Sequence, residues 1–256
     1  MSKPSSFANG VWAIAHRGAS RDCPENSIAA FDEALRQGCD AIELDLQLTR
    51  DGIPVVYHDR TLHKISSRRH RVASRELAEL RELDTGAWFD PRFAGQRILT
   101  LAEVLARYSR RTHLLLELKL RAGQPTRVRL ARTVAGMIRE ADATERVLLL
   151  CFDPELLDEA AHVFPEVRTV LNVGRLIPRG SVPSDRLSRL DAISVDVRAL
   201  TRPVVRAARR AGLPLLVFTC NRRSELDRAL GAGAAGVMSD RPGWLRSTLD
   251  RQGAVP

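Results

Sequence analysis

Apolar, strand-like runs alternate with helical patterns along almost the whole chain. Alternation of this kind is typical of a parallel sheet whose strands are joined by helical crossovers. One such helix is predicted over Ser27–Gln37, where Ile28, Phe31 and Leu35 share a face, and another begins at Asp153-Pro154. The predicted strands are Val11–Ala15, Ala41–Leu48, Pro54–Tyr57, Leu114–Leu118, Val147–Phe152, Arg168–Asn172, Ala192–Val195, Leu213–Thr219 and Ala235–Met238.

The size of the chain selects among folds with this alternation. With 256 residues, 44% of them hydrophobic, it fits one (β/α)₈ barrel of the TIM type better than two small domains. We expect a single domain over residues 1–256, with a small insertion at about residues 63–100 after the third strand. The insertion contains a helix-like stretch, Ser74–Leu83, and an aromatic loop, Trp88–Phe93, and should lie over one face of the barrel.

Polar residues follow several of the predicted strands directly. In barrels of this type the active site lies at the carboxyl ends of the strands, so these residues are candidates for chemistry. The residues that follow or end three of the runs are His16 and Arg17, His58 and Asp59, and Glu117 and Lys119.

The strand Ala41–Leu48 carries a charged face. From Ile42 to Thr49 apolar and polar residues alternate, so that Glu43 and Asp45 point to one side. An alternative interpretation is a solvated edge strand. Too few residues separate Asp45 from the next run for a helical crossover, so we expect the chain to double back through Arg50-Asp51-Gly52. This would bring Asp45 and His58 to the same end of the barrel.

Three carboxylates, on Glu43, Asp45 and Glu117, can then converge. Oxygen ligands without a Cys or His cluster favour Mg²⁺ or Ca²⁺ over zinc, so we expect a divalent cation there. The alternative for Glu117 is a structural ion pair with Lys119.

His16 and His58 are candidates for proton transfer, because imidazole titrates near neutrality. A hydrogen-bonded packing role is the alternative for a single histidine, but two of them flank the carboxylates. Arg17 and Lys119 can bind a phosphate, Arg through its forked donors and Lys as a point charge. These groups together indicate phosphodiester cleavage.

Composition limits the partners. The 40 basic and 31 acidic residues give a net charge of +9, which can attract nucleic acid or anionic lipid. The arginines are spread along the chain, so we expect no nucleic-acid partner. No apolar run approaches the roughly 20 residues of a membrane-spanning helix, and no signal peptide precedes Val11. We therefore expect a cytoplasmic protein without stable membrane anchoring, acting on a small molecule; its oligomeric state is left open.

An ordered series of motifs runs through nearly the whole chain and resembles the glycerophosphodiester phosphodiesterase family. The motifs are Ala15-His16-Arg17-Gly18, Pro24-Glu25-Asn26-Ser27, Glu43-Leu44-Asp45, Thr49-Arg50-Asp51-Gly52, Val55-Val56-Tyr57-His58-Asp59, Leu83–Phe89, Leu99-Thr100-Leu101, Glu117-Leu118-Lys119, Phe152-Asp153-Pro154, Thr219-Cys220-Asn221 and Ser239-Asp240-Arg241-Pro242.

The resemblance implies hydrolysis of deacylated phospholipids, such as glycerophosphocholine or glycerophosphoethanolamine, to glycerol 3-phosphate and an alcohol. It also implies roles for seven residues. His16 and His58 match the acid/base pair, and Arg17 and Lys119 match the phosphate contacts. The residues that match the metal ligands are Glu43, Asp45 and Glu117.

Phe218 departs from the family, which often has Trp there, and we expect it to line the substrate pocket. Either Asn26 or Ser27 can cap the first helix. Asn26 lies in a family motif, but we favour the cap as its role, whereas Glu25 can orient a site residue. One rival function is a lysophospholipase D, which would need an apolar trough from Trp88, Phe89 and Phe93. A second rival is a non-catalytic barrel that binds anions.

Overall fold

Eight parallel strands form a closed barrel in the computed structural model, which describes residues 10–67, 69–119, 127–174 and 187–253. The ring closes because β1 pairs with both β9 and β2, so the predicted (β/α)₈ fold is confirmed. In spatial order the strands are β1 (Trp12–His16), β9 (Gly236–Ser239), β8 (Leu215–Phe218), β7 (Ala192–Asp196), β6 (Arg168–Val173), β5 (Val147–Cys151), β4 (His113–Leu118) and β2 (Ala41–Leu48).

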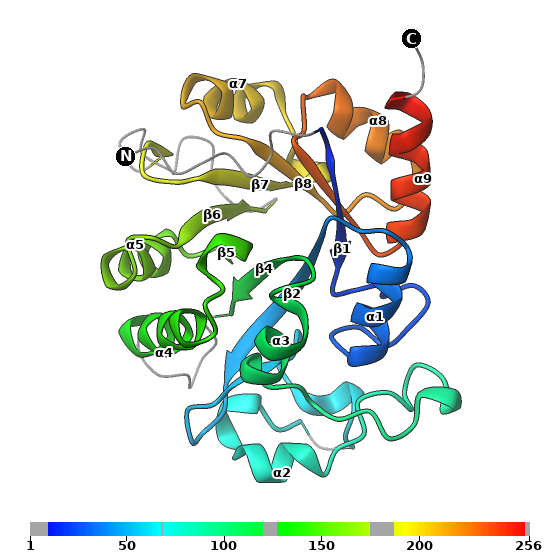
Figure 1. Ribbon diagram of the computed structural model, residues 1–256, viewed down its shortest axis with the longest axis vertical. Coiled ribbons are helices and arrows are strands. Elements are labelled where there is room, and N and C mark those ends of the chain that lie inside the picture. Colours follow the sequence, from blue (N-terminus) through cyan, green and yellow to red (C-terminus); the bar gives the residue numbers. More distant parts are fainter. Residues whose placement is uncertain (1–9, 68, 120–126, 175–186, 254–256) are drawn as a thin grey trace.

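Helices surround the barrel (Figure 1). Local sequence sets where they begin. For example, the Asp153 side chain accepts hydrogen bonds from the first turn of α5, which starts at Pro154. The helices around the barrel are α1 (Ile28–Arg36), α3 (Leu101–Tyr108), α4 (Arg127–Glu140), α5 (Pro154–Val163), α7 (Arg202–Arg210), α8 (Arg223–Gly231) and α9 (Pro242–Gly253), with short 3₁₀ turns at Thr144–Arg146 and Val197–Ala199. None of the described helices is long and apolar enough to cross a membrane.

The ninth strand, β3 (Pro54–Val56), lies outside the ring of eight. It runs antiparallel to β2, with Leu46 opposite Val56 and Leu48 opposite Pro54. The chain thus doubles back through Arg50–Gly52, as predicted, and the backbone N–H of Ile53 donates to Thr49 Oγ1 within this turn. As a result, His58 follows β3 at the same barrel end as Asp45.

The insertion follows β3 and lies at the lower edge of Figure 1. It has a small apolar core of its own, consisting of Val55, Tyr57, Leu62, Val72, Leu80 and Ile98. Its elements are η1 (Leu62–Lys64), η2 (Val72–Ser74), α2 (Leu77–Arg81) and η3 (Pro91–Phe93). The helix predicted over Ser74–Leu83 is shorter than expected, because Arg75 and Glu76 are extended and Glu76 becomes the N-cap.

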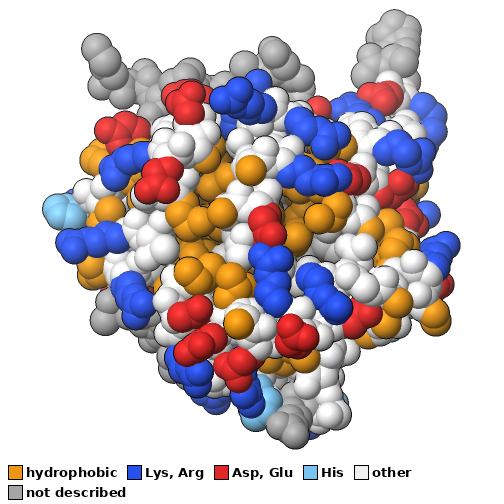
Figure 2. Space-filling view, turned by 60° about the horizontal axis from the view of Figure 1, so that its bottom comes forward, with side chains coloured by type: hydrophobic (Ala, Val, Ile, Leu, Met, Phe, Trp, Pro, Cys, Tyr) orange, Lys and Arg blue, Asp and Glu red, His pale blue; other side chains and the backbone are white. Residues whose placement is uncertain are grey.

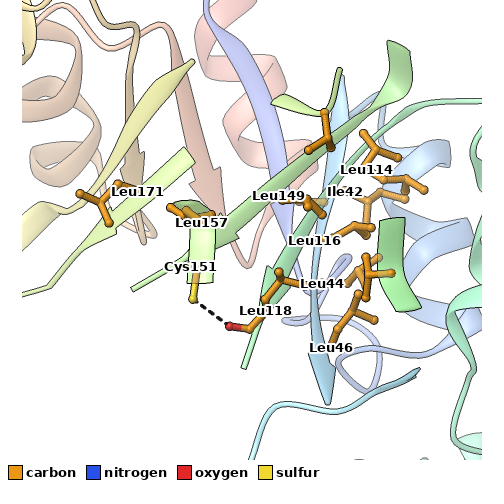
Figure 3. Packing of buried hydrophobic residues seen from close by; sticks show 14 of the residues in the cluster. Ile42, Leu44, Leu46, Leu114, Leu116, Leu118, Leu149, Cys151, Leu157 and Leu171 are labelled. Atoms are coloured by element: carbon orange, nitrogen blue, oxygen red, sulfur yellow. Dashed lines mark hydrogen bonds between the residues drawn. The ribbon is translucent and has the colours of Figure 1, made fainter. Parts of the chain in front are cut away.

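Side chains alternate between the two faces of each barrel strand. The even-numbered residues of β2 and β4, such as Leu44 and Leu116, pack in the layer between strands and helices (Figure 3). The inner face contributes residues such as Leu115 and Ala41 to a separate core cluster inside the barrel. The interpretation of β2 as a solvated edge strand is therefore wrong: all eight of its residues are buried, and it pairs on both sides.

Candidate active site

One pocket of about 480 Å³ gathers the predicted site residues at the carboxyl end of the barrel. This volume is in the range of small-molecule sites. Every residue predicted for the site lines the pocket except Asp45, whose side chain is only 1% exposed. The predicted lining residues are His16, Arg17, Glu43, His58, Glu117, Lys119 and Phe218.

Strand register brings the three carboxylates together. His16 of β1 lies beside Glu43 of β2, and Asp45 of β2 lies beside Glu117 of β4. One oxygen from each of Glu43, Asp45 and Glu117 lies within 4.8 Å of the others, and all three residues are buried. A cluster of buried carboxylates at this spacing fits a hard divalent cation.

The electrostatics of this cluster also favour a cation. Burial, together with the neighbouring charges of Asp45 and Glu117, raises the pKa of Glu43 well above its usual value. Burial likewise raises the pKa of Glu117. For Asp45 burial acts in the same direction, but Lys119 and Arg17 outweigh it and lower the pKa. Oδ1 of Asp45 accepts no well-aligned hydrogen bond from the described residues, although Lys119 Nζ lies 2.9 Å away. The donor set therefore fits the metal that the sequence predicts.

Two cations border the carboxylates. Arg17 Nε lies 3.2 Å from Asp45 Oδ2, and Arg17 Nη1 donates to Glu25 Oε2 at 3.1 Å, so Glu25 contacts a residue that is predicted for the site. Lys119 Nζ contacts both Asp45 and Glu117, and the ion pair considered as an alternative for Glu117 is therefore present. Because both cations also line the pocket, pairing with a carboxylate does not remove them from the site.

Each of the two histidines predicted for acid/base catalysis is hydrogen-bonded to an aspartate. His16 Nδ1 lies 2.6 Å from Asp240 Oδ1, and His58 Nδ1 lies 2.9 Å from Asp59 Oδ1. An ionised carboxylate can only accept, so each ring donates from Nδ1, and Nε2 becomes the ring atom suited to proton transfer. His16 Nε2 lies 4.0 Å from Glu43 Oε2, on the carboxylate side of the pocket.

The prediction that Asn26 caps the first helix is wrong. Ser27 caps α1, since its Oγ accepts the backbone N–H of Ala30. Asn26 has a left-handed backbone, with φ of 58°, and its Nδ2 donates to Asp45 Oδ2 at 2.9 Å. The sequence motif thus reflects a contact with the carboxylate cluster rather than helix capping.

The sequence motifs did not indicate a role for two polar residues beside the site, Asp240 and Asn221. Asp240 is hydrogen-bonded to His16, and Asn221 Nδ2 donates to Asp240 Oδ2 at 2.6 Å. Asp240 directly follows β9, so the strand-end pattern that located His16 and His58 could also have located it. Lys64, by contrast, lies in the insertion, where no periodic pattern indicates the site.

Phe218 lies where the sequence predicts it, on the pocket wall. Its ring meets that of Phe152 edge to face, with centroids 6.0 Å apart. In the aromatic loop, Phe89 packs against Trp88 and against Phe93, and Trp88 lines a smaller hollow beside His58. Trp88 and Phe152 are both notably exposed for large apolar side chains.

The barrel and the groups gathered at its mouth define a hydrolase of phosphodiesters. Residues 16–244 match the glycerophosphoryl diester phosphodiesterase family, and the chain belongs to that family. A glycerophosphodiester phosphodiesterase from Caldanaerobacter subterraneus subsp. tengcongensis is 32% identical over 243 residues, covering 94% of this chain and 98% of the relative.

A solved structure and a second curated relative extend this comparison. The structure of an Oleispira antarctica phosphodiesterase in complex with the product sn-glycerol-3-phosphate is similar, with a TM-score of 0.85, 29% identity and coverage of 96% of this chain and 100% of the other. A lysophospholipase D from Mus musculus is 27% identical, covering 93% of this chain and 82% of the relative.

Proposed function

We propose that this phosphoric diester hydrolase cleaves glycerophosphodiesters, such as glycerophosphocholine or glycerophosphoethanolamine, to glycerol 3-phosphate and an alcohol, with Mg²⁺ or Ca²⁺ as cofactor. The observation that carries the proposal is the convergence of three buried carboxylates, two of which line one pocket together with His16 and His58. The relative that was solved with glycerol 3-phosphate supports the substrate class.

Glu43, Asp45 and Glu117 would hold the cation. When bound, the cation supplies positive charge that stabilises a phosphoryl transition state and the attacking oxygen. Its presence would also offset the mutual repulsion that raises the pKa of Glu43.

Side chains of the pocket would bind the phosphate and transfer the protons. Arg17 and Lys119 contribute positive charge that binds and orients the phosphate. One of His16 and His58 removes a proton from the attacking oxygen, and the other protonates the leaving alcohol. The attacking oxygen is either that of water or the substrate's own glycerol hydroxyl. Phe218 and Phe152 form an apolar wall of the same pocket, against which the alcohol or glycerol part can pack.

The direct test is release of glycerol 3-phosphate from glycerophosphocholine and glycerophosphoethanolamine, each with Mg²⁺ and with Ca²⁺. Activity is expected to disappear in excess chelator and in His16→Ala and His58→Ala. Persistence of turnover in the chelator, or in both histidine variants, would exclude this mechanism.

A lysophospholipase D activity is the second candidate, and two observations favour it. One relative is a lysophospholipase D, and the exposed rings of Trp88 and Phe152 lie beside the site. Comparing turnover of lysophosphatidylcholine with that of glycerophosphocholine separates the two functions. Faster hydrolysis of the acylated substrate would select the second.

The non-catalytic, anion-binding barrel has less support. Seven of the eight predicted site residues line one pocket, and Figure 2 shows basic and acidic side chains interspersed on the face in view. Binding of nucleic acid without any diesterase activity would favour it. A cytoplasmic location stays a prediction.

A further inference from the structure

Lys64 is a half-buried cation of the insertion at the centre of a second charged cluster. Its Nζ lies 2.7 Å from Glu25 Oε1 and 3.0 Å from Asp59 Oδ2, and also 4.7 Å from the centroid of the Trp88 ring. An ammonium group has three N–H donors. Two carboxylates and one aromatic face therefore account for its contacts.

The carboxylates that Lys64 joins each use their other oxygen for a site residue. Glu25 Oε2 accepts from Arg17 Nη1 at 3.1 Å, and Asp59 Oδ1 accepts from His58 Nδ1 at 2.9 Å. Carboxylates thus alternate with nitrogen donors along a continuous series from Arg17 through Glu25, Lys64 and Asp59 to His58. Lys64 is the midpoint of this series.

Without the ammonium group the cluster would be unstable. Ligand atoms of Glu25, His58 and Asp59 all lie within 4.8 Å of one another, so two carboxylates would face each other across a partly buried space. Like charges at that distance repel, and one carboxylate would have to turn away or bind a proton. Either change would release the partner that the carboxylate holds.

The charge state of Asp59 agrees with this arrangement. Its hydrogen bond with His58 and its contacts with Lys64 lower its pKa to about 2 against the opposing effect of burial. The carboxylate is therefore ionised at neutral pH and can accept from both groups at once.

The backbone position of Lys64 is fixed by the insertion. It ends η1, which begins with the buried Leu62, and the backbone N–H of Leu62 donates to His70 O. Trp88, which covers the ammonium group, comes from a later loop of the same insertion. Two separate parts of the insertion thus hold one cation against the site.

From this geometry we propose that Lys64 is a positioning residue for the hydrolytic site: its ammonium group holds Glu25 and Asp59 so that Arg17 and His58 keep their orientations. Lys64 touches no reacting atom in this role. The inference rests on the proposed function, because it assigns Lys64 a purpose through His58 and Arg17.

The test compares Lys64→Met, which keeps most of the side-chain length without the charge, with Lys64→Arg, which restores a cation. Arg60→Met is the matched control, because Arg60 is an exposed cation of the same loop. For Lys64→Met we expect kcat to fall about tenfold to 100-fold, the range seen when outer contacts of a site are lost. Lys64→Arg should recover most of this, and Arg60→Met should stay near the wild type. Thermal unfolding identifies any variant that loses its fold.

A double-mutant cycle separates positioning from a general effect on stability. In a Glu25→Gln, Asp59→Asn background Lys64 has no carboxylate to hold, so Lys64→Met should cause little additional loss. A full additional loss in that background would overturn the proposal. So would a kcat for Lys64→Met equal to that of Arg60→Met.

A second measurement does not depend on turnover. The Nδ1 proton of His58, held by Asp59, can be followed by proton NMR and assigned with His58→Ala. Its signal should be lost or shifted in Lys64→Met and return in Lys64→Arg. An unchanged signal in Lys64→Met would contradict the inference even if the enzyme were inactive on glycerophosphodiesters, so failure of the proposed function and failure of this inference are distinguishable.

Discussion

His16 Nδ1 lies 2.6 Å from Asp240 Oδ1, although 224 positions separate the two residues in the sequence. The contact forms because β1 and β9 are neighbours in the closed ring and both end at the barrel mouth. Asp240 also accepts from Asn221 Nδ2 at 2.6 Å, which fixes its carboxylate. Although burial acts in the opposite direction, the bond with His16 helps to keep the pKa of Asp240 below its usual value. Asp240 therefore holds the His16 ring as an ionised acceptor.

Replacing Asp240 by asparagine should lower kcat about tenfold to 100-fold, because the neutral amide no longer stabilises a protonated His16 or fixes its tautomer. Steady-state kinetics on glycerophosphocholine measure the effect. The control is Asp227→Asn, which removes an exposed carboxylate paired with Arg223. Equal kcat values in the two variants would show that the contact is not needed.

Cation binding should stabilise the folded chain. A ligand that binds only the folded state adds about 2.7 kcal/mol at a concentration 100 times its Kd. We therefore expect Mg²⁺ or Ca²⁺ to raise the Tm of the wild type, and to raise the Tm of Glu117→Gln much less. The control Glu140→Gln, at an exposed position on α4, should respond like the wild type. A full response in Glu117→Gln would place the cation elsewhere.

Phe218→Ala should raise KM more than it lowers kcat, because the ring lines the pocket but carries no reacting group. Loss of apolar contact between this ring and the substrate is worth about 0.5–1.5 kcal/mol, or roughly two- to tenfold in KM. Phe218→Trp keeps an aromatic wall and should stay closer to the wild type for at least one alcohol headgroup. A kcat loss at unchanged KM would contradict this role.

Gly18 should not tolerate a side chain. Its φ is +84°, and an added Cβ would lie 2.7 Å from backbone and side-chain atoms of Ala30. Gly95 has a similar φ of +89° with nothing within 4 Å, so Gly95→Ala measures the backbone strain alone, about 1–2 kcal/mol. Gly18→Ala should lower the free energy of unfolding by about 1–3 kcal/mol more than this, measured in urea. Equal losses would mean that Ala30 and α1 can shift.

His113 should make stability depend on pH. Burial, with the charges of Arg146 and Arg168, lowers its pKa from 6.5 to about 4. Between these values the unfolded chain binds a proton that the folded chain does not, so stability is complete above pH 6.5 and falls as the pH drops toward 4.

Unfolding in urea at about pH 7 and about pH 5 tests this dependence. His113→Phe cannot titrate and keeps a ring against Trp12, so it should lose less stability on acidification than the wild type. His162→Gln, at an exposed position on α5, should behave like the wild type. Parallel curves for His113→Phe and the wild type would contradict the assignment.

The barrel and the residues at its strand ends could be predicted because both depend on local periodicity. The alternation of apolar and polar residues over Ile42–Thr49 predicted that Glu43 and Asp45 point to one side of the strand. The short interval after Asp45 predicted that the chain reverses direction into β3. The roles of Asn26 and Lys64 could not be predicted. Asn26 is turned toward Asp45 by a left-handed backbone, and Lys64 reaches Glu25 and Asp59 only after the insertion has folded. Such contacts depend on tertiary structure that no spacing encodes.

The pairing of β3 has an evolutionary consequence. This short strand pairs with β2 and forms an isolated bridge from Val55 to Thr100, and the ring of eight closes without it. His58 and Lys64 therefore belong to a segment that can lengthen, shorten or exchange loops while the barrel keeps its hydrogen bonds. The first histidine and the carboxylates, by contrast, are built into the ring itself. Among proteins that share this architecture, changes in the segment after β3 can therefore alter turnover and substrate range. The ring of eight strands, which carries the rest of the site, maintains the fold.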